Sequence, residues 1–197
     1  AELVDLKQQL AVAFRSLVRR GKWFSPTRRA ISAFVGEAQQ TLTGSVRGDI
    51  VFSDALIGVG EVAISDHRSS QPTLDDVLRL ASEAHVAGLM TGKAGIVHLH
   101  LGDGTRGLEL VRQALDTSEL PPRVFQPTHI NRKKALFEEA LALAKRGCHV
   151  DITAFPVEEG EDAWPADEAL VRYLDSGAPP ERVSISSDAG GCLPCFD

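Results

Sequence analysis

Side chains that can bind a metal ion or move a proton recur at or just past the ends of short β-branched runs in this sequence. The set comprises Asp66, His67, Arg68, His98, His100, His129, Arg132, Asp151 and Asp188. Two histidines with carboxylates from separate strands fit a zinc site of the catalytic type, which leaves one ligand position for water. The pattern therefore indicates a catalytic metal site as the candidate chemistry.

The histidines differ in what their spacing allows. His98 and His100 are two residues apart in one run, so they project from the same face of a strand and are both candidate ligands. His85 and His149 stand alone, and a lone histidine is more often a structural residue than a ligand, so we expect structural roles for both.

The elements that must position these side chains alternate between strands and helices from Thr41 onward. The predicted strands are Val59–Ser65, Ile96–Leu101, Val124–Thr128, His149–Thr153 and Val183–Ser187, with 49–52 as a weaker sixth. The predicted helices are Leu74–Val86, Leu108–Leu115, Lys133–Arg146 and Ala166–Leu174. Strands separated by crossover helices form a parallel sheet.

Two architectures satisfy this alternation: an open doubly wound sheet and a (β/α)₈ barrel. The open sheet usually carries a glycine-rich phosphate-binding turn, and neither GxGxxG nor GxxxxGK[ST] occurs here. In a barrel, the carboxyl ends of the strands converge on one face, which would bring the polar residues into one pocket.

The composition is that of a globular protein. The chain has 197 residues, of which 43% are hydrophobic and 24% charged. No apolar run reaches the length of a membrane-spanning helix, and no signal peptide is apparent. Three cysteines are too few for a disulfide framework, so we expect a cytoplasmic protein with no membrane partner. The CxxC formed by Cys192 and Cys195 is a weak redox or metal signal.

Residues 1–40 differ from the rest in charge. They carry seven Lys or Arg against three Asp or Glu, whereas the whole chain has a net charge of -6. Glu2–Arg20 has apolar residues at helical spacing, so we predict a basic amphipathic helix ending at Gly21. A solvated basic face is the simpler interpretation, with contact to nucleic acid or anionic lipid as the alternative. The acidic total argues against nucleic acid as the main partner.

Six ordered blocks of sequence resemble the isoaspartyl (β-aspartyl) dipeptidases of the amidohydrolase superfamily. The blocks are Thr43–Val46, Ala63–Ser69, His100–Asp103, Pro127–Arg132, Asp151–Thr153 and Ser186–Asp188. The resemblance implies a (β/α)₈ barrel that binds zinc and hydrolyses small β-aspartyl dipeptides. It extends over about residues 41–197, so we expect a partial TIM barrel of amidohydrolase type that carries the later strands.

The resemblance also assigns metal ligands. The single-histidine ligands fall on His100 and His129, which makes His98 a neighbour that faces inward. The metal-bridging position, a carboxylated lysine in some members, falls on Glu61, which likewise offers two oxygens. Asp188 matches the aspartate that ligates one metal and transfers the proton.

The substrate contacts implied by the resemblance are Arg68, Arg132 and Cys192. The two arginines match residues that hold substrate carboxylates, a task suited to the bidentate guanidinium fork. Cys192 occupies the position of a serine that helps to hold the substrate in some members.

Two parts of the family pattern have no counterpart here. The family's first strand carries His-x-His, and no histidine precedes Thr41; its carbonyl-polarising tyrosine lies near Thr43, whereas the only tyrosine is Tyr173. We therefore expect one retained zinc site, a depleted second site, and weak or no peptidase activity in this chain.

A barrel without its early strands also has open edges. These are covered by the N-terminal helix, a second copy in a homo-oligomer, or another chain. The alternative functions are a catalytically inactive barrel fragment that acts by association, and another amidohydrolase of the same superfamily.

Overall fold

The computed structural model describes residue 41 and residues 43–188, which form a mixed α/β fold with parallel strands. The strands are β1 (Gly58–Ile64), β2 (Ile96–Leu101), β3 (Phe125–Thr128), β4 (Val150–Thr153) and β5 (Val183–Ser186). The helices are α2 (Val46–Phe52), α3 (Leu74–Thr91), α4 (Glu109–Thr117), α5 (Lys134–Lys145) and α6 (Ala166–Asp175). The predicted alternation of strands and helices is confirmed from β1 to β5.

The strands form two parallel sheets instead of the single sheet expected. One sheet has the order β1-β2-β3, and the other pairs β4 with β5. The His149 amide donates to the Phe125 carbonyl at 3.1 Å, but no ladder joins β3 to β4. Pro127 lies in β3 and has no N–H to donate, which weakens any ladder there. Because the described residues contain two separate sheets, the partial barrel stays a prediction.

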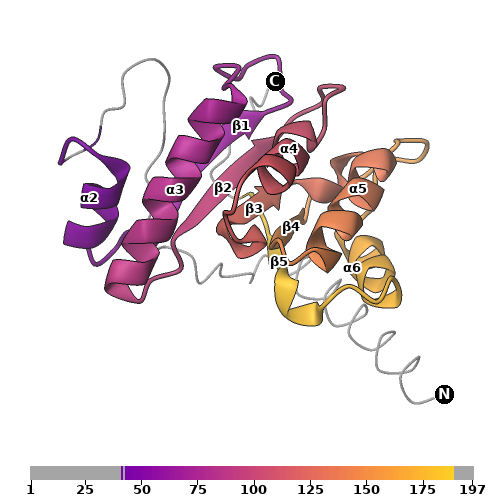
Figure 1. The fold of residues 1–197 in the computed structure, drawn as a ribbon. Coiled ribbons are helices and arrows are strands. Elements are labelled where there is room, and N and C mark those ends of the chain that lie inside the picture. Colours follow the sequence, from indigo (N-terminus) through magenta and orange to yellow (C-terminus); the bar gives the residue numbers. More distant parts are fainter. Residues whose placement is uncertain (1–40, 42, 189–197) are drawn as a thin grey trace.

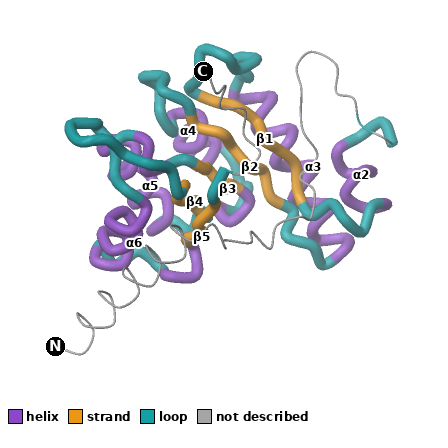
Figure 2. The backbone as a smooth tube through the Cα atoms, turned by 180° about the vertical axis from the view of Figure 1, so that it is seen from behind, coloured by secondary structure: helices purple, strands orange, loops and turns teal. Residues whose placement is uncertain are grey.

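Helices α3, α4 and α5 cover one side of the strands (Figure 1), and the strands face the viewer when the molecule is turned by 180° (Figure 2). Val97, Leu99 and Leu101 of β2 are completely buried in the core. His98 and His100 alternate with them and are half-buried. The helices therefore pack against the apolar face of the sheet, and the polar side chains lie on the opposite face.

Helix α3 has strong signals at both ends. The Thr73 hydroxyl and the Asp76 carboxylate form a capping box at the start, and Gly92 ends the helix in the left-handed conformation with φ 71°. Near that end, Gly88 lies against Gly95, where a Cβ on Gly88 would come within 2.8 Å of the Gly95 Cα. The helix therefore runs to Thr91, where Gly92 caps it, and not to the predicted end at Val86.

The strand expected at residues 49–52 is wrong, because these residues form the end of α2. The Ser45 hydroxyl accepts a hydrogen bond from the Gly48 amide at 2.9 Å. The Asp49 carboxylate accepts from both the amide and the hydroxyl of Thr43 at 2.8 Å. These capping bonds start a helix, and they outweigh the strand preference of the Ile50–Val51 pair.

Several sequence predictions fall outside the described residues: the basic helix at Glu2–Arg20, the domain boundary near residue 40, and the pair Cys192 and Cys195. Cys148 is buried, and burial raises the pKa of its thiol to about 12, so it is part of the core. Within residues 43–188, no helix has both the length and the apolar character needed to cross a membrane.

Side chains bridge the two sheets where the backbone ladder is missing. Asp151 of β4 is 4% exposed. Its carboxylate accepts hydrogen bonds from the hydroxyls of Thr128 at 2.7 Å, Ser184 at 2.6 Å and Ser186 at 2.6 Å. The carboxylate therefore links β3, β4 and β5 and fixes the strand that leads to Asp188.

We predict that Asp151→Val lowers the free energy of unfolding by about 2–4 kcal/mol, because the hydroxyls lose their acceptor. Asp151→Asn keeps one acceptor oxygen and should cost about 1–2 kcal/mol. Ser184→Ala removes one exposed donor and serves as the control, with a loss below about 1 kcal/mol. Urea unfolding measures all three, and equal losses in Asp151→Val and Ser184→Ala would contradict this role.

Candidate metal centre

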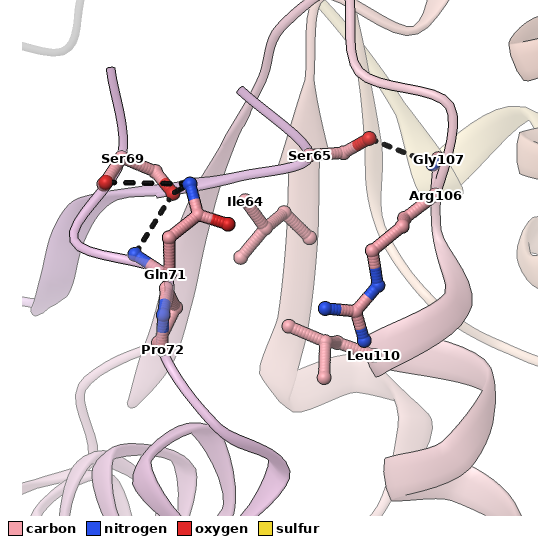
Figure 3. A pocket seen from close by; sticks show the side chains of 8 residues that line it. All are labelled: Ile64, Ser65, Ser69, Gln71, Pro72, Arg106, Gly107 and Leu110. Carbon is pink, nitrogen blue, oxygen red and sulfur yellow. Dashed lines mark hydrogen bonds between the residues drawn. The ribbon is translucent and has the colours of Figure 1, made fainter. Parts of the chain in front are cut away.

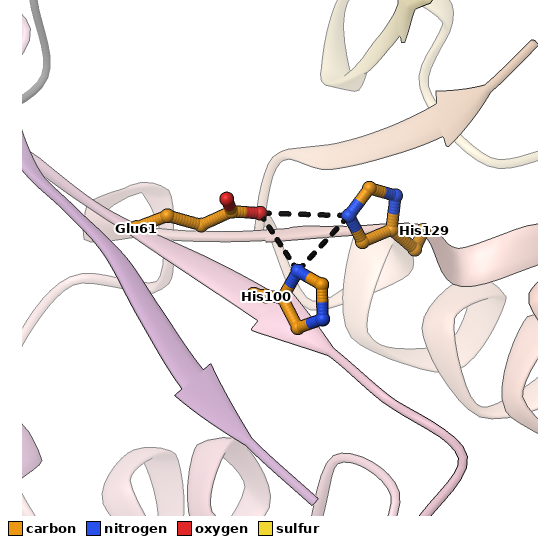
Figure 4. A group of neighbouring side chains, drawn as sticks. All are labelled: Glu61, His100 and His129. Atoms are coloured by element: carbon orange, nitrogen blue, oxygen red, sulfur yellow. Dashed lines mark hydrogen bonds and ion pairs between the residues drawn. The ribbon is translucent and has the colours of Figure 1, made fainter. Parts of the chain in front are cut away.

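Glu61, His100 and His129 meet at the polar face of the first sheet (Figure 4). The His100 Nδ1 lies 3.0 Å from the Glu61 Oε1 and 3.1 Å from the His129 Nε2. The His129 Nε2 lies 3.5 Å from the same Glu61 oxygen. The structure therefore brings together three of the four predicted metal ligands, one from β1, one from β2 and one from the residue that follows β3.

An irregularity in β1 places Glu61. Val59 pairs with Val97 and Val62 pairs with Leu99, so Gly60 and Glu61 together lie opposite His98. This two-against-one pairing is a β-bulge, which redirects side chains and is common beside functional sites. Gly60 allows the close approach, because a Cβ there would lie 2.6 Å from the His98 carbonyl oxygen. The bulge lets Val59 and Val62 both face the core while Glu61 faces the histidines.

The second nitrogen of each histidine is held by a neighbouring side chain. The His100 Nε2 lies 3.2 Å from the Asp66 Oδ2, and the His129 Nδ1 lies 2.7 Å from the Thr153 hydroxyl. Asn131 fixes this end of β4: its amide nitrogen donates to the Thr153 carbonyl, and its oxygen accepts from the Thr153 amide. Both rings are therefore oriented with the remaining nitrogen toward Glu61.

The charge of Glu61 is stabilised by the two rings. Hydrogen bonding to His100, and next to His129, holds the pKa of Glu61 well below its usual range, although burial opposes this shift. Glu61 is therefore an ionised carboxylate. An ionised carboxylate with two imidazoles is a donor set that zinc accepts readily.

Asp188 follows β5 and completes the predicted set. Its Oδ2 lies 4.0 Å from the His129 Nε2, and its side chain is 41% exposed. The residue has φ 51°, in the left-handed region, which turns the chain directly after the strand. The aspartate thus lies beside His129 with part of its side chain exposed to solvent.

The two predicted substrate arginines are both engaged within the protein. Arg68 binds Asp66 through two side-chain bonds, from Nε at 3.0 Å and from Nη2 at 2.7 Å, and its side chain is 63% exposed. The Arg132 Nη1 donates to the Leu101 carbonyl at 2.9 Å. Cys192 lies outside the described residues.

The other histidines lie outside the cluster. The Nδ1 atoms of His85 and His98 are buried without a hydrogen-bond partner, and the His149 Nε2 lies 2.9 Å from the Arg182 Nη1. A second group, Asp66, His67 and Asp103, also has the composition of a metal site. His67 and Asp103 are 76% and 70% exposed, and the Asp66 carboxylate is already bound by Arg68, so this group lacks a free set of ligands.

Tyr173 has a structural role. It is completely buried in α6, and its hydroxyl donates to the Pro179 carbonyl at 2.8 Å. Burial raises the pKa of this phenol to about 12. The residue therefore cannot serve as the carbonyl-polarising tyrosine of the family.

A pocket beside the end of β1 has the wrong size for a peptide ligand. It is lined by residues that include Ile64, Gln71 and Arg106 (Figure 3), and its volume of about 20 Å³ accommodates roughly one water molecule. The cluster around Glu61 is therefore the better candidate site.

Sequence reasoning missed the supporting residues of this centre. Thr153 and Asn131 stood in blocks that carried the family resemblance but had no assigned role, and Asp66 was noted only as a polar residue after a strand. A signal was present for Thr153, since a hydroxyl at the end of a neighbouring strand is well placed to bind the second nitrogen of a metal-ligating histidine.

The chain is similar to two kinds of known protein. No family model matches the chain. The crystal structure of the beta-aspartyl dipeptidase of the thermophilic, keratin-degrading Fervidobacterium islandicum AW-1, in complex with beta-Asp-Leu dipeptide, is 45% identical with a TM-score of 0.71. That match covers 80% of this chain and 41% of the solved chain. Another structure of this enzyme is 44% identical with a TM-score of 0.68, over 75% and 39% of the two chains.

Matches to curated proteins are shorter. The argininosuccinate synthase of Clostridium perfringens is 30% identical in an alignment of 85 residues that covers 36% of this chain and 21% of that enzyme. That of Moorella thermoacetica is 46% identical over 44 residues, which are 22% and 11% of the two chains. This chain thus spans less than half of the length of any of these proteins, and over most of its own length it resembles beta-aspartyl dipeptidase, as its motifs predicted.

Proposed function

We propose that this protein is a metal-dependent hydrolase of isoaspartyl-dipeptidase type, which cleaves small β-aspartyl dipeptides. The observation that carries the proposal is the convergence of Glu61, His100 and His129, with Asp188 4.0 Å from one of the histidines. The 45% identity to a beta-aspartyl dipeptidase solved with beta-Asp-Leu supports the substrate class. A partial (β/α)₈ barrel belongs to the same proposal, because the parallel strands and one-sided helices are the parts such a barrel requires.

Zinc is the metal we propose. The ligand atoms of Glu61, His100 and His129 lie within 4.8 Å of one another, which suits tetrahedral binding with a fourth position open. When bound there, zinc supplies a Lewis acid and lowers the pKa of a coordinated water. Glu61 contributes the negative charge of the site, and the two rings contribute neutral nitrogen ligands.

Asp188 is the residue we assign to proton transfer. Its carboxylate lies 4.0 Å from the His129 Nε2, and from this position it would take a proton from an attacking water and return it to the departing amine. Its backbone is fixed by β5, which Asp151 holds through Ser184 and Ser186. Proton transfer needs hydrogen-bond distance, so these bonds to β5 would help to keep the Asp188 carboxylate in place.

The substrate carboxylates are assigned to Arg68 and Arg132. A β-aspartyl dipeptide carries two carboxylates, and guanidinium groups bind such groups in a bidentate manner. Arg68 is 63% exposed and keeps donors free for a ligand while bound to Asp66. We assign Cys192 a weaker contact, because a thiol donates poorly. We also propose that the protein is soluble and cytoplasmic, that it forms a homo-oligomer, and that it binds neither nucleic acid nor membranes.

The metal site is tested by zinc content after dialysis. We expect about one zinc ion per chain or fewer, because a three-ligand site can still hold the ion. His100→Ala should remove most of it, whereas His98→Ala, two residues earlier on the same face of β2, should retain it. Equal zinc loss in the two variants, or two tightly held ions in the unmodified chain, would contradict the assignment.

Hydrolysis of β-Asp-Leu by the zinc-loaded protein tests the activity and the role of Asp188. Asp188→Asn keeps the shape of the side chain but cannot accept the proton, so kcat should fall about 10²- to 10⁴-fold with little change in melting temperature. Asp54→Asn, in the exposed turn after α2, is the matched control and should retain the rate. If no product forms above a zinc blank, the alternative of a non-catalytic protein that acts by association is favoured over the proposed hydrolase.

A further inference from the structure

Asp66 lies behind the metal centre, and its contacts go beyond those of a surface turn. Its side chain is 1% exposed, and both carboxylate oxygens are engaged. Oδ1 accepts from the Arg68 amide at 2.8 Å and from the Arg68 Nε at 3.0 Å. Oδ2 accepts from the Arg68 Nη2 at 2.7 Å and faces the His100 Nε2 at 3.2 Å.

The surrounding chain is shaped to hold this carboxylate. A Cβ on Gly102 would lie 2.4 Å from the Asp66 Oδ2 and 2.5 Å from its Cγ, so any larger residue at 102 would displace the side chain. The Asp66 carbonyl accepts from the Ser69 amide and from the Gln71 side chain, which fix the loop. The Arg68 guanidinium donates to both oxygens of Asp66, so the carboxylate is held in an ion pair and acts as an acceptor.

We infer that Asp66 is a positioning residue that couples the metal site to the substrate site. An acceptor at the His100 Nε2 requires a proton on that nitrogen, which leaves Nδ1, the atom next to Glu61 and His129, to bind a metal ion. The same carboxylate orients the Arg68 guanidinium for the substrate. This inference rests on the proposed function, and it adds that one buried carboxylate prepares both the ligand and the substrate-binding arginine.

Asp66→Asn is the sharpest substitution. An asparagine has a single acceptor oxygen, so whichever way it points, its NH₂ group meets an N–H group of Arg68. With the NH₂ group at the Oδ2 position, His100 also loses its acceptor. We expect zinc affinity to fall about 10- to 100-fold, the range seen when such outer partners are removed. Gly102→Ala keeps Asp66 but displaces its carboxylate, so this variant should also have a lower zinc affinity.

Two controls separate this role from general disturbance of the loop. Gln71→Ala removes a bond to the Asp66 carbonyl and leaves the carboxylate in place, so zinc affinity should change less than about threefold. Arg68→Ala removes a proposed substrate contact, so it should raise the KM for β-Asp-Leu. It leaves the contact between Asp66 and His100 in place, so the zinc affinity should not change. Thermal unfolding of each variant verifies that it is folded.

The experiment combines competition with a zinc chelator and ¹⁵N NMR of the His100 ring in metal-free protein. We expect a protected Nε2–H resonance in the unmodified and Gln71→Ala proteins, and its loss in Asp66→Asn. If the unmodified chain shows this resonance but binds no zinc, the proposed function fails and the positioning by Asp66 stands. If it binds zinc and Asp66→Asn binds equally well with the resonance intact, the role of Asp66 is refuted while the metal site stands.

Discussion

The contact on which the site depends is the ionised carboxylate of Glu61 against the imidazoles of His100 and His129. The facing nitrogens of the two rings are 3.1 Å apart, so they repel unless a proton or another cation lies between them. The Glu61 oxygen, 3.0 and 3.5 Å from these nitrogens, stabilises positive charge at this point. The hydrogen bonds between Glu61 and the two histidines also lower the pKa of Glu61.

The bonds behind the cluster keep these polar groups from relaxing apart. Asp66 binds the far nitrogen of His100, and Thr153 binds that of His129. Thr153 and Asp151 lie two residues apart on β4, and Asp151 binds Thr128, the residue before His129. Side chains of β4 thus hold consecutive positions at the end of β3, where the backbone ladder is missing. The gap between the sheets is closed by polar bonds that also orient a metal ligand.

The sequence was informative where local rules decide the structure, and less so where distant segments meet. Caps and apolar periodicity predicted each strand from β1 to β5 and the helices between them. Spacing alone could not decide whether His98 or His100 is the metal ligand, because the two share a strand face. The family resemblance indicated His100, and the structure places that residue in the cluster. The bulge at Gly60 depends on the register with β2, which no local pattern specifies. The helix at α2 was missed because its capping bonds outweigh a short β-branched run.

The same geometry explains why a cation fits this cluster. His100 lies between two carboxylates, Glu61 at Nδ1 and Asp66 at Nε2, and Arg68 offsets the charge of only the second. A divalent ion bound at Nδ1 would therefore offset the charge of Glu61. The proton on Nε2 stays, because Asp66 holds it from the protein side. A metal ion bound on the Glu61 side would thus leave the His100 ring oriented and the Arg68 guanidinium in place.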